Sequence, residues 1–301
     1  MRALMLFVIV AGAFFISGCS DVFNYGHGVV INKFEFDPSY IEAGQPTYLS
    51  LEFQNQGQFA AEDVYLNVYG LRDEWVPLDG ETLSDWVLVG DVEAPVIEGN
   101  NLIAQGEIVY YDWMFKAPKD VKSEDRRVNT MWTRVCYSYK TIARSKIKMV
   151  SSDEWYSRTQ QEKIDVTVSK GPVDLKIESM QPIIVHSSEP GFTLLRVSID
   201  NAGGGVFLND SSVCEDLGSE GIEDLLNQIG YVKVSLDGND AVCDFDSEIY
   251  LRRGESQVFT VNCDNLDIGN GPIREIDVEI EFRYKYYIDS NADVAVKGVN
   301  R

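Results

Sequence analysis

The feature that most constrains the fold is a pattern of residues that occurs twice along the chain. An alternating apolar run that ends in Asn-x-Gly contains, in its two copies, Leu49, Leu51, Phe53, Asn55 and Gly57, and Leu195, Val197, Ile199, Asn201 and Gly203. A later run repeats as Val135, Tyr137 and Tyr139, and as Phe282, Tyr284 and Tyr286. The distance between the copies differs by only one residue in the two places. Two copies of one structural unit are therefore predicted.

Around this repeat the chain has the pattern of β-structure. Runs rich in β-branched and aromatic residues alternate with polar positions, and clusters of Gly, Asn, Asp and Pro separate them, as in antiparallel strands with one buried face. Such runs cover 48–55, 64–71, 108–115, 134–141 and 163–170. Helical patterns are confined to two short stretches, 151–158 and 219–230. We expect an all-β fold with minor short helices.

The segment Ser169-Lys170-Gly171-Pro172 separates the two copies. Pro172 disfavours helix in the residue before it and so favours an extended joint. Because this joint is short, we expect two modules stacked end to end rather than on a flexible tether. The predicted modules are 28–170, which carries an insertion at 72–105, and 171–301.

The N-terminus has the pattern of an export signal. After Arg2, an uncharged apolar run at 3–16 is shorter than the roughly 20 residues that span a bilayer. This length indicates that residues 1–18 form a signal peptide. The tail Ile16-Ser17-Gly18-Cys19 resembles the lipobox of bacterial lipoproteins. That resemblance implies that Cys19 receives a diacylglyceryl group, with 19–27 as a linker to the first module. The alternative is an ordinary signal with a chance cysteine.

The formal net charge of −22 disfavours nucleic acid as a partner, because an acidic surface repels phosphate. Bases nevertheless gather between Lys116 and Lys148. One interpretation is a surface that meets an acidic partner or neighbour. The other, which we favour, is a solvated hairpin and strand edge protected from aggregation by its charges.

Four cysteines remain besides Cys19, and export makes disulfides feasible. Cys243 and Cys263 both end strand-like runs that flank a hairpin-like segment, and we expect them to pair. No CxxC motif is present, so zinc and redox chemistry lack support, and no cofactor is expected. Asn209 begins a glycosylation sequon, Asn209-Asp210-Ser211.

Catalytic motifs are missing from the sequence. Only His27 and His186 are present, and neither stands in a nucleophile or metal-binding pattern, so we assign no catalytic residue. Asp289, Asn291 and Asp293 have the spacing that opens calcium-binding loops, but the glycine and the bidentate acid of such loops are missing. We favour the alternative that these residues form a polar hairpin turn.

Two tryptophans in the 72–105 insertion, Trp75 and Trp86, are candidate partner-binding residues. An exposed aromatic side chain can stack on a sugar or anchor a protein partner. The alternative, which is the more common role, is that both pack the insertion onto the sandwich.

The segments SLEFQNQGQFAAEDVYLNV (50–68) and LLRVSIDNAGGGVF (194–207) resemble the CARDB family, the immunoglobulin-like, adhesion-related modules of archaeal and bacterial surface proteins, including S-layer-associated chains. The resemblance implies two tandem immunoglobulin-like β-sandwich modules. It also implies a non-catalytic adhesion or envelope-scaffold protein, with an envelope protein or glycan as partner and the membrane reached through lipid on Cys19. A solute- or glycan-binding lipoprotein that uses the insertion is the alternative, and an enzyme of unknown class comes third.

Overall fold

The computed structural model describes residues 27–70, 74–78, 86–99, 101–155, 164–178, 182–186, 191–209, 213–217, 228–229, 231–240, 243–245, 249–251, 255–269 and 271–299. The expected signal segment 1–18 and the lipidation site Cys19 lie outside these residues. Within them, no helix has the length and apolar character needed to cross a membrane.

The fold is all-β, as the sequence pattern predicts. Helical structure in the described residues is limited to α1 (Ser152–Trp155) and the 3-10 turn η1 (Cys214–Asp216). The backbone N–H of Glu154 donates to Ser151 Oγ at 3.3 Å, the contact expected from the capping pattern. Most of the helix predicted at 219–230 lies outside the described residues, and its end instead forms the short strand β16 (Gln228–Ile229).

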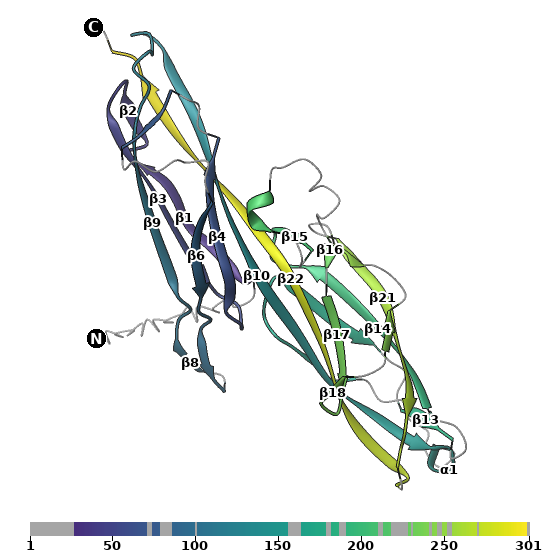
Figure 1. The fold of residues 1–301 in the computed structure, drawn as a ribbon. Helices are drawn as coiled ribbons and strands as arrows, with labels where there is room; N and C mark the ends of the chain where they lie inside the picture. Colours follow the sequence, from purple (N-terminus) through teal and green to yellow (C-terminus); the bar gives the residue numbers. More distant parts are fainter. Residues whose placement is uncertain are drawn as a thin grey trace, which may run out of the picture.

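The first β-sandwich consists of two sheets (Figure 1). One has the strand order β1 (Val29–Asp37), β3 (Pro46–Asn55), β9 (Ile108–Lys116) and β5 (Val76–Pro77). The other contains β6 (Val87–Val92), β4 (Ala61–Tyr69), part of β10 (Arg126–Ser151), part of β22 (Ile273–Lys297) and β2 (Tyr40–Glu42).

The second β-sandwich repeats this plan. One sheet has the order β12 (Val173–Glu178), β14 (Gly191–Asn201), β21 (Ser256–Leu266) and β19 (Cys243–Phe245). The other contains β18 (Asn239–Asp240), β17 (Tyr231–Leu236), the remainder of β22 and β10, β15 (Val206–Leu208), β11 (Val166–Val168) and β13 (Ile183–Val185). Among the described residues there are also two small strand pairs: β7 (Val96–Glu98) with β8 (Asn101–Ala104), and β16 with β20 (Ile249–Tyr250).

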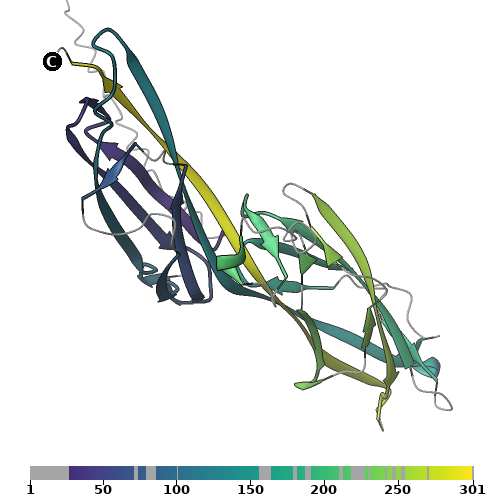
Figure 2. The same cartoon turned by 45° about the horizontal axis from the view of Figure 1, so that its top comes forward.

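Two long strands run through both sandwiches. β10 and β22 pair antiparallel without interruption from Arg126 opposite Lys297 to Val150 opposite Ile273. β10 first pairs with β4 of the first sandwich and then with β11 and β13 of the second. β22 pairs with β17 of the second sandwich and then with β2 of the first. Figures 1 and 2 show these teal and yellow strands crossing the whole length of the molecule.

This strand sharing changes the expected domain division. In each sandwich, one of the two long strands of the β10–β22 sheet comes from the other half of the chain, so 28–170 and 171–301 are not self-contained sandwiches. The Gly-Pro joint lies where the chain enters β12, but it does not separate two cores. The buried apolar residues accordingly form one main cluster that includes side chains of both sandwiches.

The Asn-x-Gly turns hold corresponding positions in the two sandwiches. Asn55 Nδ2 donates to the carbonyl oxygen of Phe59 at 2.8 Å, and Asn201 Nδ2 donates to that of Gly205 at 3.0 Å. Both asparagines are buried at the end of a strand. There the side-chain amides donate the hydrogen bonds that water would otherwise donate to the turn's carbonyl groups. The repeat seen in the sequence is therefore a repeat of structure.

The Tyr-x-Tyr pairs meet where the two sandwiches join. We call this region, made of Tyr137, Tyr139, Tyr284 and Tyr286, the waist. All four rings are buried, and Tyr137 packs edge-on against Tyr286 with ring centroids 6.0 Å apart. Burial raises the pKa of Tyr139 to about 12 and raises the pKa values of Tyr137 and Tyr284 well above the usual 10. The waist is a packed core with hydrogen-bonded hydroxyls.

Candidate functional site

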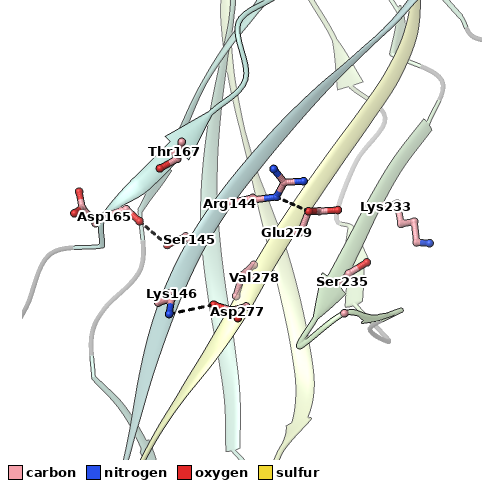
Figure 3. Close-up of a pocket in the computed structure, with 11 residues that line it drawn as sticks. Arg144, Ser145, Lys146, Asp165, Thr167, Lys233, Ser235, Asp277, Val278 and Glu279 are labelled. Carbon is pink, nitrogen blue, oxygen red and sulfur yellow. Dashed lines mark hydrogen bonds and ion pairs between the residues drawn. The ribbon is translucent and has the colours of Figure 1, made fainter. Parts of the chain in front are cut away.

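The outer face of the second sandwich carries a ladder of opposite charges across β10 and β22. Arg144 Nε lies 2.7 Å from Glu279 Oε2, and Lys146 Nζ lies 3.7 Å from Asp277 Oδ1 (Figure 3). These pairs form because strand alternation puts the bases of β10 and the acids of β22 on one face, directly opposite each other in the register. The C-terminal part of the basic stretch 116–148 therefore lies in the middle of a sheet, not in a hairpin or at an unpaired edge.

These charge pairs form the floor of an open trough of about 780 Å³. The trough crosses from β11 over β10 and β22 to β17 (Figure 3). Its charged lining consists of Arg144, Lys146, Asp165, Lys233, Asp277 and Glu279. Three bases and three acids in alternating places, together with hydroxyl groups from Ser235 and Thr167, suit a polar ligand that offers both signs of charge or many hydroxyls.

The ion pairs of the trough are open to water. The side chains of Lys146 and Asp277 are 71% and 73% exposed, and those of Arg144 and Glu279 are 64% and 36% exposed. Exposed pairs of this kind contribute little to stability, about 0–1 kcal/mol each. Their charges can therefore exchange an internal partner for a ligand group at small cost.

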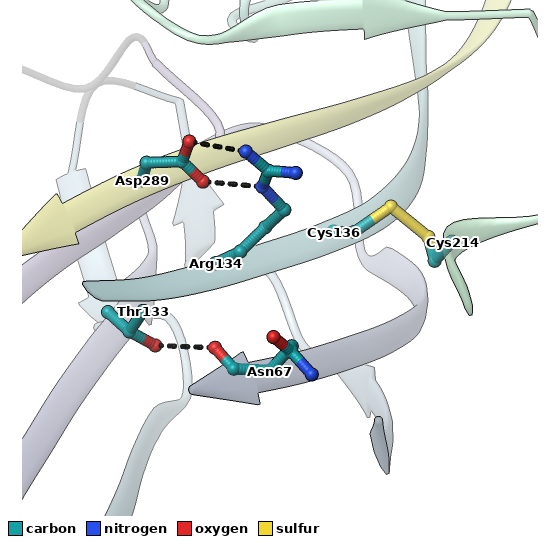
Figure 4. Close-up of polar contacts among 6 residues, drawn as sticks. All are labelled: Asn67, Thr133, Arg134, Cys136, Cys214 and Asp289. Atoms are coloured by element: carbon teal, nitrogen blue, oxygen red, sulfur yellow. Dashed lines mark hydrogen bonds and ion pairs between the residues drawn. A yellow bond between two sulfur atoms is a disulfide. The ribbon is translucent and has the colours of Figure 1, made fainter. Parts of the chain in front are cut away.

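A second polar cluster lies on the first sandwich's side of the waist. Arg134 holds Asp289 through two hydrogen bonds of 2.7 Å, from Nε to Oδ1 and from its second guanidinium nitrogen to Oδ2 (Figure 4). Its guanidinium also lies over the ring of Tyr287, with Cζ 4.2 Å from the centroid. Desolvation is the largest influence on the pKa of Arg134 and lowers it, but the hydrogen bonds that Arg134 donates to Asp289 and the attraction of that carboxylate together outweigh it, so the pKa is raised. This cluster is an internal clamp between β10 and β22.

The structure corrects the expectation for Asp289, Asn291 and Asp293, because the three lie along the uninterrupted strand β22. A strand extends by about 3.3 Å per residue, so alternate side chains project side by side and do not wrap an ion. Asp289 is held by Arg134, and Asp293 Oδ1 accepts from Thr130 Oγ1 at 2.6 Å. The polar hairpin turn is equally ruled out here. In the described residues no group of three or more candidate ligands gathers to hold a metal.

Trp75 and Trp86 do not have the exposure of free anchor residues. Trp75 is only 4% exposed, with its ring 6.1 Å from that of Phe36. Trp86 is half-buried and packs against the cluster that contains Cys136 and Tyr287. These contacts match the alternative in which the two rings pack the 72–105 segment onto the sandwich.

Two disulfides join the four cysteines that lie in the described part of the chain. Cys243 and Cys263 are joined on β19 and β21, the pairing expected from the sequence. Cys136 and Cys214 are also joined, and this bond ties β10 to η1 (Figure 4). Asn209 is half-buried directly after β15, and the remainder of its sequon, 210–211, lies outside the described residues.

The 72–105 segment does present a surface, but an aliphatic one. β7 and β8 form a hairpin that projects from the first sandwich (Figure 1). Val96, Ile97 and Ile103 are 55%, 42% and 61% exposed on it. Beside this hairpin, which we call the arm (96–104), lies a crevice of about 550 Å³, whose lining includes Gln56 and Lys170.

The sequence contains a signal for the trough, but it is divided between two segments that are far apart in the chain. The bases at 144, 146 and 148 and the acids at 275, 277 and 279 each alternate along a strand-like run. Only the pairing of those two runs shows that the charges share one face.

No family model and no curated protein matches the chain. Three solved structures resemble it weakly. The collagen-binding domain of Erysipelothrix rhusiopathiae surface protein RspB is 12% identical, with 91% of this chain and 97% of that chain covered and a TM-score of 0.14. The collagen adhesin CNA of S. aureus is 8% identical, with 90% and 93% covered and a TM-score of 0.12.

The CupB6 tip adhesin of Pseudomonas aeruginosa is also 8% identical, with 85% of this chain and 90% of that chain covered and a TM-score of 0.14. Likenesses at these TM-scores have no weight for the function of this chain. The resemblance to CARDB modules accordingly rests on the sequence motifs alone.

Proposed function

We propose that the protein is a non-catalytic, extracytoplasmic adhesion or envelope-scaffold lipoprotein that recognises a polar surface partner through the trough. The observation that carries the proposal is the trough itself. It lies on an outer sheet face, the side chains of its ion pairs are exposed to water, and its lining alternates in charge from strand to strand. Such a face suits an extended polymer or a protein surface better than a small, enclosed solute.

The long β10–β22 ladder supports the same role. A surface protein that links a membrane to a partner must keep its contact face at a fixed distance and orientation. Here one continuous pair of strands passes through both sandwiches, so the trough is rigidly connected to the sandwich at the other end of the molecule. The lipid on Cys19 would supply the membrane end, since multiple acyl chains hold a protein firmly at a bilayer.

Binding of the membrane-extracted protein to isolated native envelope, and to a glycan array, tests the recognition step. A double variant, Arg144→Glu with Glu279→Arg, keeps a charge pair in the trough but reverses its direction. We expect at least about a tenfold loss of binding, because electrostatic recognition depends on which sign stands where. Normal binding by this double variant would remove the trough from the proposal.

The membrane anchor has its own test. Mass spectrometry should find the mature chain beginning at a lipid-modified Cys19, and Cys19→Ser should release the protein from membranes. An unmodified Cys19 in an uncleaved chain would contradict the anchor.

A second candidate function is solute or glycan binding at the crevice beneath the arm. The crevice combines an aliphatic wall from Ile97 and Leu102 with amide groups of Gln56 and Gln58, a mixture typical of small-molecule sites. A saturable thermal shift with a single small sugar, abolished by Ile97→Asp but kept in the trough variant, would favour this function over the scaffold.

A further inference from the structure

The outer face of the β10–β22 sheet in the first sandwich carries exposed aromatic side chains. Trp132 of β10 lies directly opposite Tyr69 of β4, and the two residues are 40% and 36% exposed. Farther along this face, Val128 of β10 and Tyr40 of β2 flank Ala295 of β22, and they are 60% and 52% exposed. We call Tyr40, Tyr69 and Trp132, together with Val128, the aromatic face. Exposed apolar side chains that gather on one face indicate an interaction surface.

Two of the rings are held in fixed positions. The guanidinium of Arg134 lies over the Tyr69 ring, with Cζ 5.5 Å from the centroid. Asp289 clamps the same guanidinium with two hydrogen bonds (Figure 4). Gly70 lies against the indole of Trp132, since a Cβ at Gly70 would stand 3.2 Å from Trp132 Cδ1. Because these rings are already ordered, little side-chain entropy is lost when a ligand stacks on them.

Polar groups stand next to the rings. Asn291 of β22 lies opposite Trp132, on the other side of β10 from Tyr69. In the next row of the same face, Thr130 Oγ1 donates to Asp293 Oδ1 at 2.6 Å. A sugar ring has an apolar C–H face, which stacks on an aromatic ring, and hydroxyl groups around its rim. Rings with amide, hydroxyl and carboxylate groups beside them therefore suit sugar recognition.

The internal repeat shows that the fold does not require an aromatic ring at this place. By the spacing of the repeat, the counterpart of Trp132 in the second sandwich is Glu279. Asn291, which lies opposite Trp132, has Arg144 as its counterpart. The same position of the repeated unit therefore carries an exposed ion pair in the second sandwich and an exposed indole in the first. Because the ion pair supports an equivalent sheet, the exposed indole indicates a role other than folding.

The far end of the aromatic face carries two bases side by side. Arg126 of β10 lies directly opposite Lys297 of β22, and both are exposed. Arg126 Cζ lies 5.5 Å from the centroid of the Tyr40 ring. Within the described part of the chain, neither base forms an ion pair. Like charges that stand opposite each other in a sheet repel, so an anionic group placed between them is attracted by both.

These features together define the chemistry of the ligand. From Arg126 to Trp132 the face extends over six residues of strand, about 20 Å, which is long enough for several linked sugars. The net charge of −22 repels a densely charged polyanion at long range. A glycan in which acidic and neutral sugars alternate satisfies both conditions, because one acidic group can lie between the two bases while neutral rings stack.

We propose that the aromatic face binds an acidic glycan. A carboxylate-bearing sugar lies at Arg126 and Lys297, and neutral sugar rings stack on Tyr40, Trp132 and Tyr69. This site is separate from the trough, since the trough is lined by the parts of β10 and β22 that belong to the second sandwich.

Isothermal titration calorimetry on the membrane-extracted protein tests the site with a tetrasaccharide in which uronic acid and N-acetylglucosamine alternate. The neutral tetrasaccharide of N-acetylglucosamine is the matched control ligand. We expect the acidic ligand to bind at least about tenfold more tightly, because its carboxylate accepts hydrogen bonds from charged donors. This advantage should shrink as the salt concentration is raised, since salt screens the attraction of the two bases.

Variants locate the binding. Trp132→Ala should weaken the binding of both ligands by at least about tenfold, whereas Trp132→Phe should keep most of it, because a ring remains for stacking. Arg126→Gln with Lys297→Gln should remove the advantage of the acidic ligand and leave the neutral one unchanged. The matched control, Lys176→Gln with Arg196→Gln, removes two exposed bases from the outer face of β12 and β14, and it should change neither affinity.

Equal affinity for the two tetrasaccharides, or no binding of either, would overturn the proposal. Unchanged binding by Trp132→Ala would remove the aromatic face from it. An equal loss in the Lys176→Gln/Arg196→Gln control would do the same, because net charge alone would then govern binding. Binding to vesicles that contain phosphatidylglycerol, without binding to the acidic tetrasaccharide, would show that the two bases meet a lipid surface and would overturn the glycan.

Discussion

Ser138 of β10 lies directly opposite Lys285 of β22, and these two residues are also each other's counterparts in the internal repeat. A residue that pairs with its own counterpart marks a local two-fold axis, so the two sandwiches are related by a half-turn about this pair. Each long strand leaves its own sandwich at this point and completes the other one. The arrangement is that of a strand-swapped dimer whose two copies are joined in one chain.

The first prediction concerns the second half of the chain. Residues 172–301 expressed alone should not form a stable sandwich, although the sequence repeat by itself favours an independent module. The fragment lacks the part of β10 that pairs with β22, β11 and β13, and it leaves the apolar face of β22 uncovered. Circular dichroism and thermal melting should show no cooperative transition.

Its control is complementation. Mixing this fragment with residues 27–171 should restore a cooperative β-sheet melt, because the two long strands then find each other. A fragment 172–301 that melts cooperatively as a monomer under oxidising conditions would contradict the strand-sharing account.

The second prediction concerns the buried tryptophan of the 72–105 segment. Trp75→Ala should lower the free energy of unfolding by roughly 3–5 kcal/mol, because a large side chain leaves a cavity in the core. The matched control is Trp132→Ala on the outer face of β10, where the side chain is 40% exposed and the cost should be about 1 kcal/mol or less. Equal urea midpoints for Trp75→Ala and the wild type would show that this ring does not hold the segment in place.

The third prediction compares the two disulfides. Cys136 and Cys214 are 78 residues apart in sequence, and Cys243 and Cys263 are 20 apart. A longer closed loop restricts the unfolded chain more, so the Cys136→Ala/Cys214→Ala protein should be less stable than the Cys243→Ala/Cys263→Ala protein by about 1 kcal/mol. Denaturant unfolding of the two double variants measures the difference, and the opposite order would mean that native packing around the bonds outweighs chain entropy.

The fourth prediction is a loss of stability at alkaline pH. Tyr139 has a folded-state pKa of about 12, while an unfolded tyrosine ionises near 10. A raised folded pKa contributes stability that is complete below pH 10 and is lost as the pH rises from 10 through about 12, since the unfolded chain releases its proton first. Tyr139→Phe should flatten this decline in urea midpoints measured from pH 8 to 11. An unchanged slope would show that other groups cause the alkaline unfolding.

Much of the local structure follows from the sequence. Alternation of apolar and polar residues from Leu49 to Phe53 predicts a strand with one buried face, and the structure buries Leu49, Leu51 and Phe53. The Cys243–Cys263 pairing also follows, because both residues end runs that lie close together along the chain. These features depend on neighbours in sequence, which a single chain reveals.

Other features depend on which distant strands pair. The motif at Asp289, Asn291 and Asp293 resembles a turn or a cation loop because its residues are polar and near each other in sequence. The ladder with β10 makes it a strand, since pairing satisfies its backbone groups on that side and Arg134 clamps Asp289. The turn propensity of a few polar residues is weaker than the strand pairing along this long ladder.

The sequence by itself determined that this protein is all-β, that it contains one structural unit twice, and where most of its strands lie, because periodicity and turn residues act over a few positions. Only the tertiary structure decided that the two units share their long strands and that the charges of β10 and β22 form one trough. It also decided that Cys136 joins Cys214. The shared strands and the trough require residues more than a hundred positions apart on β10 and β22 to meet in one register. The free energy of that meeting comes from burying apolar side chains of both sandwiches in one core, which no local pattern encodes.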